Sequence, residues 1–252
     1  MARRFGIGTF AFVTSAGSRR LLALLCGALS LVGAFASQAP PNVLTAEERG
    51  AGWKLLFDGQ TTTGWRSYKK QTFPTNHWRI DEGWLKLIPG KGGGHIMTAR
   101  PYTNYEFSWE WRITPKGNNG VKYFISEELG QIIGHEYQLL DDVITRDEKS
   151  STASFYNVLP PLKDKRLKPP GEINFSKIVI NGKHVEHWLN GTKVVAYELG
   201  SPEVQQAVTQ SKYRNVPGYA SKPMPGHIML TDHKSETWFR SIKIRELSNR
   251  AD

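Results

Sequence analysis

One short segment, GHEYQLLDD, carries a carboxylate and an amide at a spacing that suits a sugar ligand. Glu136 and Gln138 lie two residues apart in it, and alternating strand side chains would place both on one face. Together they offer the acceptors and donors that sugar hydroxyls need. Asp141 lies an odd step further and reaches the same face only through a bulge or at the strand end. An exposed polar face of an outer strand is the plain alternative.

A lysine stands in a second strand-like segment, NNGVKYF. Asn118 opens a turn there, and Lys122 follows in the predicted strand. An ammonium group beside a reacting carbonyl stabilises the oxyanion that forms on it. The ordinary alternative for Lys122 is a solvated surface lysine.

A third segment, HVEHWL, offers imidazoles, a carboxylate and an indole. On strand alternation His184, Glu186 and Trp188 face one way and His187 the other. The indole of Trp188 is a flat apolar platform for a pyranose ring. His187 lies between two aliphatic residues, which is more typical of a satisfied core histidine than of a catalyst.

A strand end near the carboxyl terminus places Asp232 beside His233, and Arg240 follows in the next strand. Loops at strand ends often carry function, although Asp232 also fits an ordinary turn cap. The sequence has no zinc or calcium-loop spacing, nucleophile elbow, phosphate loop or dinucleotide fingerprint. We therefore predict no cofactor, and the sequence leaves a bound metal open.

Short alternating runs separated by Gly, Pro and Asn dominate the chain and predict an all-β protein. We expect an antiparallel β-sandwich with at most one or two short helices, the best being Pro202–Lys212 with Ser201 as N-cap. Asn181-Gly182 and Asn190-Gly191 predict two type I′ hairpins. The expected strands are Trp53–Phe57, Trp78–Ile80, Trp84–Ile88, Glu106–Thr114, Val121–Ser126, His135–Leu140, Phe175–Ile180, His184–Leu189, Val194–Tyr197, Gly226–Leu230 and Thr237–Arg245.

The first 36 residues have the pattern of a cleaved signal peptide. Arginines precede an apolar run that ends in Ala34-Phe35-Ala36, an A-x-A site. We expect residues 37–48 to form a flexible leader and residues 49–248 a single domain, in a periplasmic or secreted protein. Arg19-Arg20 also resembles a twin-arginine signal. The single cysteine, Cys26, lies inside the apolar run, so the mature chain has no thiol chemistry.

The formal net charge of +10 predicts a basic surface suited to anionic glycans or an envelope surface. No zinc motif, helix-turn-helix pattern or Arg-rich arm accompanies the charge, so a nucleic-acid partner is not expected. The mature chain contains no apolar run long enough to span a membrane.

An ordered set of motifs resembles the bacterial 3-keto-disaccharide hydrolase family over residues 50–247. The set is Leu56-Phe57-Asp58-Gly59-Gln60 with Gly64-Trp65, Asn118–Phe124, Gly134–Asp142, Ser154-Phe155-Tyr156 with Pro160-Pro161, Gly171-Glu172-Ile173-Asn174, Gly182–Gly191 and Phe239–Ile244. The resemblance implies a concanavalin A-like jelly roll. It also implies cleavage of glycosides already oxidised to a ketone at C3, downstream of a sugar C3 oxidoreductase.

On this resemblance Glu136 is the base that removes the C2 proton, with Lys122 or His187 polarising the ketone. The leaving group at C1 is then expelled, and water adds to the enone. The sugar site would be lined by Asn118, Gln138, Asp141, Trp188, His233 and Arg240.

Three departures from the family pattern keep other functions open. Thr145-Arg146 stands where relatives have His-Pro, Ile173 replaces a Trp, and Thr231 and Lys234 replace a Gln and a Gly. A non-catalytic carbohydrate-binding module is therefore the first alternative. A retaining glucanase that uses Glu136 and Asp141 is the second, and its two carboxyls must lie roughly 5 Å apart.

Overall fold

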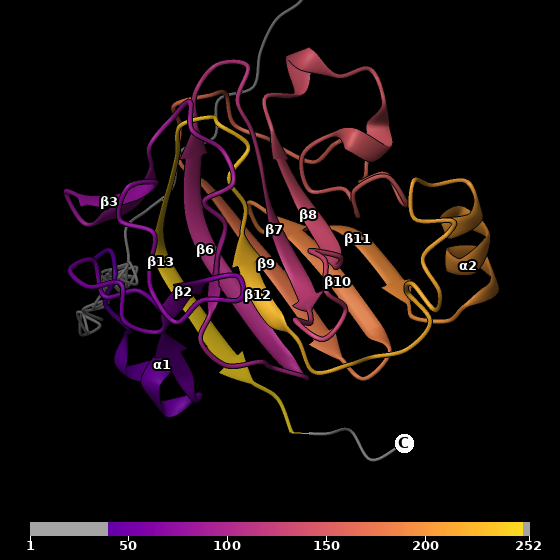
Figure 1. Ribbon diagram of the computed structural model, residues 1–252, viewed down its shortest axis with the longest axis horizontal. Coiled ribbons are helices and arrows are strands. Elements are labelled where there is room, and N and C mark those ends of the chain that lie inside the picture. Colours follow the sequence, from indigo (N-terminus) through magenta and orange to yellow (C-terminus); the bar gives the residue numbers. More distant parts are fainter. Residues whose placement is uncertain (1–39, 249–252) are drawn as a thin grey trace, which may run out of the picture. The chain divides into compact units, whose positions relative to one another are not determined.

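The computed structural model describes residues 40–248, which form a sandwich of two antiparallel sheets (Figure 1). The predicted fold class is confirmed, and the only α-helices described are α1 (Ala46–Gly50) and α2 (Pro202–Thr209). Short 3-10 turns cover Asp142–Ile144 and Glu148–Ser150. Nothing in the described part is a helix long and apolar enough to cross a membrane. The predicted signal peptide lies outside the described residues.

The larger sheet has eight strands. Their order is β11 (Thr192–Glu198), β10 (His184–Leu189), β9 (Asn174–Asn181), β6 (Tyr105–Ile113), β13 (Thr237–Glu246), β4 (Trp84–Leu87) and β3 (Trp78–Asp81), with β1 (Trp53–Leu55) also paired to β13. The smaller sheet has the order β2 (Trp65–Ser67), β5 (Ile96–Thr98), β12 (His227–Leu230), β7 (Asn118–Ile125) and β8 (His135–Leu140).

An aromatic core joins the two sheets. In β6 all the odd-numbered residues are buried, among them Trp109 and Trp111, whereas Glu110 points out. Trp109 meets Tyr137 of β8 edge to face, at 5.1 Å between ring centroids. Because Tyr137 faces this core, alternation turns Glu136 and Gln138 to the outer face of the smaller sheet.

The two predicted hairpins differ in type. In the second, Asn190 and Gly191 both have positive φ, as type I′ requires. In the first, His184 pairs with Asn181, so the central residues are Gly182 and Lys183, and only Gly182 has positive φ. That pattern matches type II′, in which glycine occupies the first central position.

Several short elements were not predicted. Strands β2 and β5 have three residues each, too few to show a period. Helix α1 starts inside the expected leader, where Thr45 and Glu48 form a reciprocal capping box. Asn42 donates to the Gly83 carbonyl at 2.8 Å, so this stretch is bound to the sandwich. The predicted helix after Ser201 is present, with the Ser201 side chain accepting from Val204 N–H, and ends at Thr209.

A bulge in β7 shapes the outer face of the smaller sheet. Phe124 has φ +58°, and the register between β7 and β12 shifts there, so that Ile125 pairs with His227 but Lys122 with Met229. Ile125 consequently joins Met97 and Met229 in a small apolar cluster separate from the core. Because Met229 is the cross-strand partner of Lys122, this cluster lies on the same face as that lysine.

Candidate active site

Two charged side chains face each other across β7 and β8. Lys122 and Glu136 are register partners, and Lys122 Nζ lies 3.6 Å from Glu136 Oε2. The Glu136 side chain is only 3% exposed and that of Lys122 14%. The two ion-pair contacts of Glu136 among the described residues are loose, at 3.6 Å from Lys122 and 3.7 Å from His233. The carboxylate is therefore charge-balanced but free to accept a proton from a ligand.

A loop after β12 brings an imidazole to the same carboxylate. His233 Nε2 lies 3.7 Å from Glu136 Oε1. The preceding residue, Asp232, is buried and anchors the loop: its Oδ2 accepts from Gly94 N–H at 2.9 Å and lies 3.1 Å from His77 Nδ1. Asp232 thus acts as a positioning group rather than a ligand of the sugar.

His95, at the start of β5, completes this side of the site. Its Nδ1 accepts the backbone N–H of Asp232 at 2.9 Å, so the neutral ring carries its proton on Nε2. Burial, then the nearby charges of His233 and Lys122, lowers the pKa of His95 to about 4. The ring meets that of His233 edge to face at 6.1 Å. At neutral pH His95 is an uncharged hydrogen-bond donor.

The charge of Glu136 is set by opposing effects. Burial by itself raises the pKa of this carboxyl, but His233, Lys122 and Lys212 together outweigh burial and hold it below the ordinary value. Glu136 is consequently ionised at neutral pH, in the form that a general base needs.

A third group of side chains borders Glu136 on the side of β8 that faces away from β7. Phe155 bridges to Tyr137, which places Tyr156 opposite Glu136 on the outer face, and Tyr156 N–H donates to the Glu136 carbonyl at 3.0 Å. The ammonium of Lys212 lies 4.1 Å from the centre of the Tyr156 ring. Lys122 and Tyr156 therefore flank Glu136 from opposite sides.

Polar groups continue along the same face. Gln138 Nε2 donates to Asn118 Oδ1 at 3.1 Å, and Gly120 lies between Asn118 and Lys122 in β7. The structure thus brings Glu136, Lys122, His233, Gln138 and Asn118 together on one face.

Asp141 does not join this group. It caps the 3-10 turn after β8, where Oδ2 accepts from Lys116 N–H at 2.7 Å. Asp141 lies five residues after Glu136, roughly 16 Å along an extended chain. That separation is far beyond the roughly 5 Å of a retaining pair, so the geometry does not support the glucanase alternative.

His187 also lies elsewhere. It is fully buried between the sheets, where Nδ1 lies 2.9 Å from the Ala153 carbonyl oxygen and Nε2 2.7 Å from the Tyr123 hydroxyl. Burial lowers its pKa to about 4. The side chain faces the core, whereas Glu136 faces away from the core, so the placement does not support His187 as the group that polarises the ketone.

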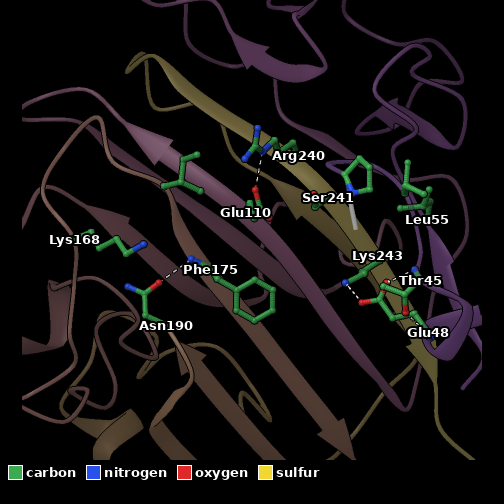
Figure 2. Close-up of a pocket in the computed structure, with 13 residues that line it drawn as sticks. Thr45, Glu48, Leu55, Glu110, Lys168, Phe175, Asn190, Arg240, Ser241 and Lys243 are labelled. Atoms are coloured by element: carbon green, nitrogen blue, oxygen red, sulfur yellow. Dashed lines mark hydrogen bonds and ion pairs between the residues drawn. The ribbon is translucent and has the colours of Figure 1, made fainter. Parts of the chain in front are cut away.

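Trp188 and Arg240 lie on the outer face of the larger sheet, which is the opposite side of the sandwich. Trp188 Nε1 donates to Glu186 at 2.7 Å. Arg240 pairs with Glu110 at 2.6 Å and covers the ring of Trp84 at 4.2 Å. Arg240 lines a groove of about 490 Å³ on that face. Figure 2 shows its side chain in that groove, in contact with Glu110. Neither side chain reaches Glu136, and their expected sugar contacts are not supported.

Comparison with known proteins shows the family of the chain. The sequence model of one family, described as a 3-keto-alpha-glucoside-1,2-lyase-like domain, matches residues 52–245. The chain belongs to this family. A curated relative, the 3-keto-disaccharide hydrolase of Bacteroides thetaiotaomicron, is 27% identical over 230 residues, which cover 78% of this chain and 79% of the relative.

Solved structures agree with the assignment to the 3-keto-alpha-glucoside-1,2-lyase-like family. A protein of Parabacteroides distasonis ATCC 8503 that is named a glycosyl hydrolase superposes with a TM-score of 0.74 and is 30% identical. The match covers 83% of this chain and 100% of that protein. A second protein of that organism, also named a glycosyl hydrolase, superposes with a TM-score of 0.65 and is 26% identical. The match covers 77% of this chain and 99% of that protein.

Sequence reasoning missed several residues of this family member's site. His95 follows three glycines, a sign of close backbone approach, and no other pattern marked it. Tyr156 belongs to one of the family motifs, but the sequence offered no reason to assign it a role. Lys212 and Tyr213 lie in a loop whose sequence has neither helical nor strand periodicity. No group of three or more His, Cys, Asp or Glu side chains arranged to hold a metal ion occurs among residues 40–248.

Proposed function

We propose that this protein cleaves glycosides whose sugar ring carries a ketone at C3. The observation that carries the proposal is the buried, ionised Glu136 facing Lys122 and His233. A ketone at C3 acidifies the C2 proton, so a carboxylate is a strong enough base to remove it. A site for this reaction needs a base, a cation beside the ketone oxygen and donors for the ring hydroxyls, and this face of the smaller sheet offers all three.

The residues then have distinct roles. Glu136 accepts the C2 proton, and the electron pair of the C–H bond moves to the C3 oxygen as an enolate. Lys122 stabilises that oxygen. When the carbonyl re-forms, the C1–O bond breaks and leaves an enone, to which water adds at C1. Gln138 and Asn118 bind hydroxyls, and His95 Nε2–H and His233 bind oxygens on the opposite side.

The motif departures do not fall on this machinery. Thr145 and Arg146 line a separate surface pocket that contains neither Glu136 nor Lys122. Ile173 lines the groove on the larger sheet. Thr231 donates to Asn119 Oδ1 at 2.6 Å beneath β7, and Lys234 has φ +71°, the conformation that a glycine adopts freely. These placements favour an enzyme over a non-catalytic binding module.

The assay that tests the proposal compares 3-keto-trehalose with trehalose. The purified protein should release keto-glucose and glucose from the first and nothing from the second. Glu136→Gln keeps the shape of the side chain but cannot accept a proton, so turnover should fall by about 10²- to 10⁴-fold while binding remains. Binding of the keto-sugar without turnover by the unmodified protein would instead make it a binding module.

We propose further that the protein is exported and acts after a sugar C3 oxidoreductase. The apolar run before Ala36 motivates export. The mature protein should begin at Ser37, and N-terminal sequencing of envelope material that begins at Met1 would contradict this. The oxidoreductase follows from the substrate, because only a C3 oxidation supplies the ketone.

A further inference from the structure

The loop formed by residues 211–225 presents two polar groups at the edge of the site. Lys212 N–H donates to Asn157 Oδ1 at 2.6 Å, which fixes the loop beside Tyr156. Tyr213 stacks on Tyr219 at 4.2 Å between ring centroids, and the Tyr219 hydroxyl donates to the Gly134 carbonyl at 3.1 Å, just before β8. The loop is therefore pinned at both sides of Glu136.

The Tyr213 hydroxyl lies near that of Tyr219 but has no partner of hydrogen-bond geometry within the described residues, and the residue is only 6% exposed. A buried hydroxyl without a partner is costly and indicates a ligand or water that completes it. Glu136 is close enough to raise the pKa of Tyr213, after burial as the larger cause. The hydroxyl thus lies in the electrostatic surroundings of the proposed base.

Lys212 shares these surroundings. Partial burial lowers its pKa, Glu136 opposes that effect, and Lys122 adds to it. The ammonium lies over the Tyr156 ring at 4.1 Å and 5.0 Å from the centre of the Tyr213 ring, and no carboxylate of the described residues pairs with it within 4.0 Å. Glu136 therefore has a cation on each side, Lys122 in β7 and Lys212 in the loop.

The proposed reaction develops negative charge on two oxygens, the ketone oxygen and the glycosidic oxygen. In the proposed reaction Lys122 serves the ketone oxygen, while the glycosidic oxygen still needs a proton donor. We propose that Lys212 is the acid for the leaving group and that Tyr213 binds the departing sugar, which makes these two residues the leaving-group subsite. This assignment rests on the proposed function.

The proton balance of the step is simple. As the enolate collapses, the C1–O bond breaks and its electron pair goes to the glycosidic oxygen. That oxygen takes a proton from the Lys212 ammonium, so the leaving sugar departs as a neutral alcohol. The resulting neutral amine regains a proton from solvent, while Glu136 releases the C2 proton before the next turnover.

The test uses two substrates that differ only in their need for an acid. The full protein is assayed on 3-keto-trehalose, whose leaving sugar needs a proton, and on 4-nitrophenyl 3-keto-glucoside, whose phenolate leaves unprotonated. Lys212→Met should lose about 10²- to 10⁴-fold in kcat on the first and stay within about tenfold on the second. Tyr213→Phe should show the same preference with a smaller loss, at unchanged thermal stability.

Two controls frame this result. Lys222→Met removes the same charge from the same loop and should leave both rates unchanged, whereas Glu136→Gln should lower both. Equal losses of Lys212→Met on the two substrates, or no loss on either, would overturn the acid assignment. Failure of the unmodified protein on both substrates would overturn the proposed function and the assignment with it.

Discussion

The carboxylate of Glu136 lies directly over Gly120, the glycine between Asn118 and Lys122. A Cβ atom built on Gly120 would lie 2.3 Å from Glu136 Oε1 and 3.1 Å from its carboxyl carbon. The position of the proposed base therefore depends on the absence of a side chain in the neighbouring strand.

Gly120→Ala should displace the carboxylate and lower kcat on a keto-glycoside by about 10²-fold, the effect of a misplacement of about 1 Å. The backbone at Gly120 lies outside the left-handed region, so alanine adds no strain of its own. Steady-state kinetics with a thermal melt checks this. Gly50→Ala, with nothing within 4 Å of the added atom, is the matched control. Normal turnover by Gly120→Ala would contradict the assigned role of Glu136.

On the acid side of its pH profile, kcat/KM should begin to fall only at low pH. The pKa of Glu136 lies below its ordinary value of 4.5, so the base form persists until the pH falls below that range. Lys122→Gln removes one of the charges that lower this pKa, and the acid limb should move to higher pH. An acid limb that stays in place in Lys122→Gln would assign the titration to another group.

Stability should decrease on acidification before any carboxylate titrates. Burial lowers the pKa of His95 to about 4, of His135 to about 3 and of His187 to about 4, against 6.5 for the ordinary group. Above pH 6.5 these residues are neutral in both states and contribute no pH dependence. Below it the unfolded chain binds more protons, so the free energy of unfolding falls by up to about 1.4 kcal/mol per pH unit for each histidine.

Urea unfolding at pH 7.5, 6.0 and 5.0 measures this slope. His135→Gln should be less stable at pH 7.5, because the contact with the Tyr197 hydroxyl at 2.8 Å is altered, but should show a shallower pH dependence. An unfolding free energy that stays constant between pH 6.5 and 5.0 would be incompatible with three neutral buried histidines.

Substitutions on the outer faces of the two sheets should have different effects, one on KM and the other on stability. Gln138→Ala removes a hydroxyl contact beside Glu136 and should raise KM for a keto-glycoside by about tenfold, the effect of one lost hydrogen bond. Arg240→Ala breaks the pair with Glu110 on the other sheet, so KM should stay constant while stability falls by about 1 kcal/mol or less. Kinetics and chemical denaturation of the two variants check the placement, which a raised KM in Arg240→Ala would refute.

The sequence by itself determined the class of fold, the strands of four or more residues and the relation of side chains within one strand. Glu136 shares a face with Gln138 because alternation is a property of a single extended segment, and the motif order identified the family. Only the tertiary structure decided which face of which sheet each strand presents. Alternation cannot tell that Trp188 and Arg240 lie on the larger sheet, or that His187 faces the core. His95, Tyr156 and Lys212 come from segments more than 50 residues apart and meet at Glu136 only through strand pairing and loop packing, since local periodicity carries no information about such long-range contacts.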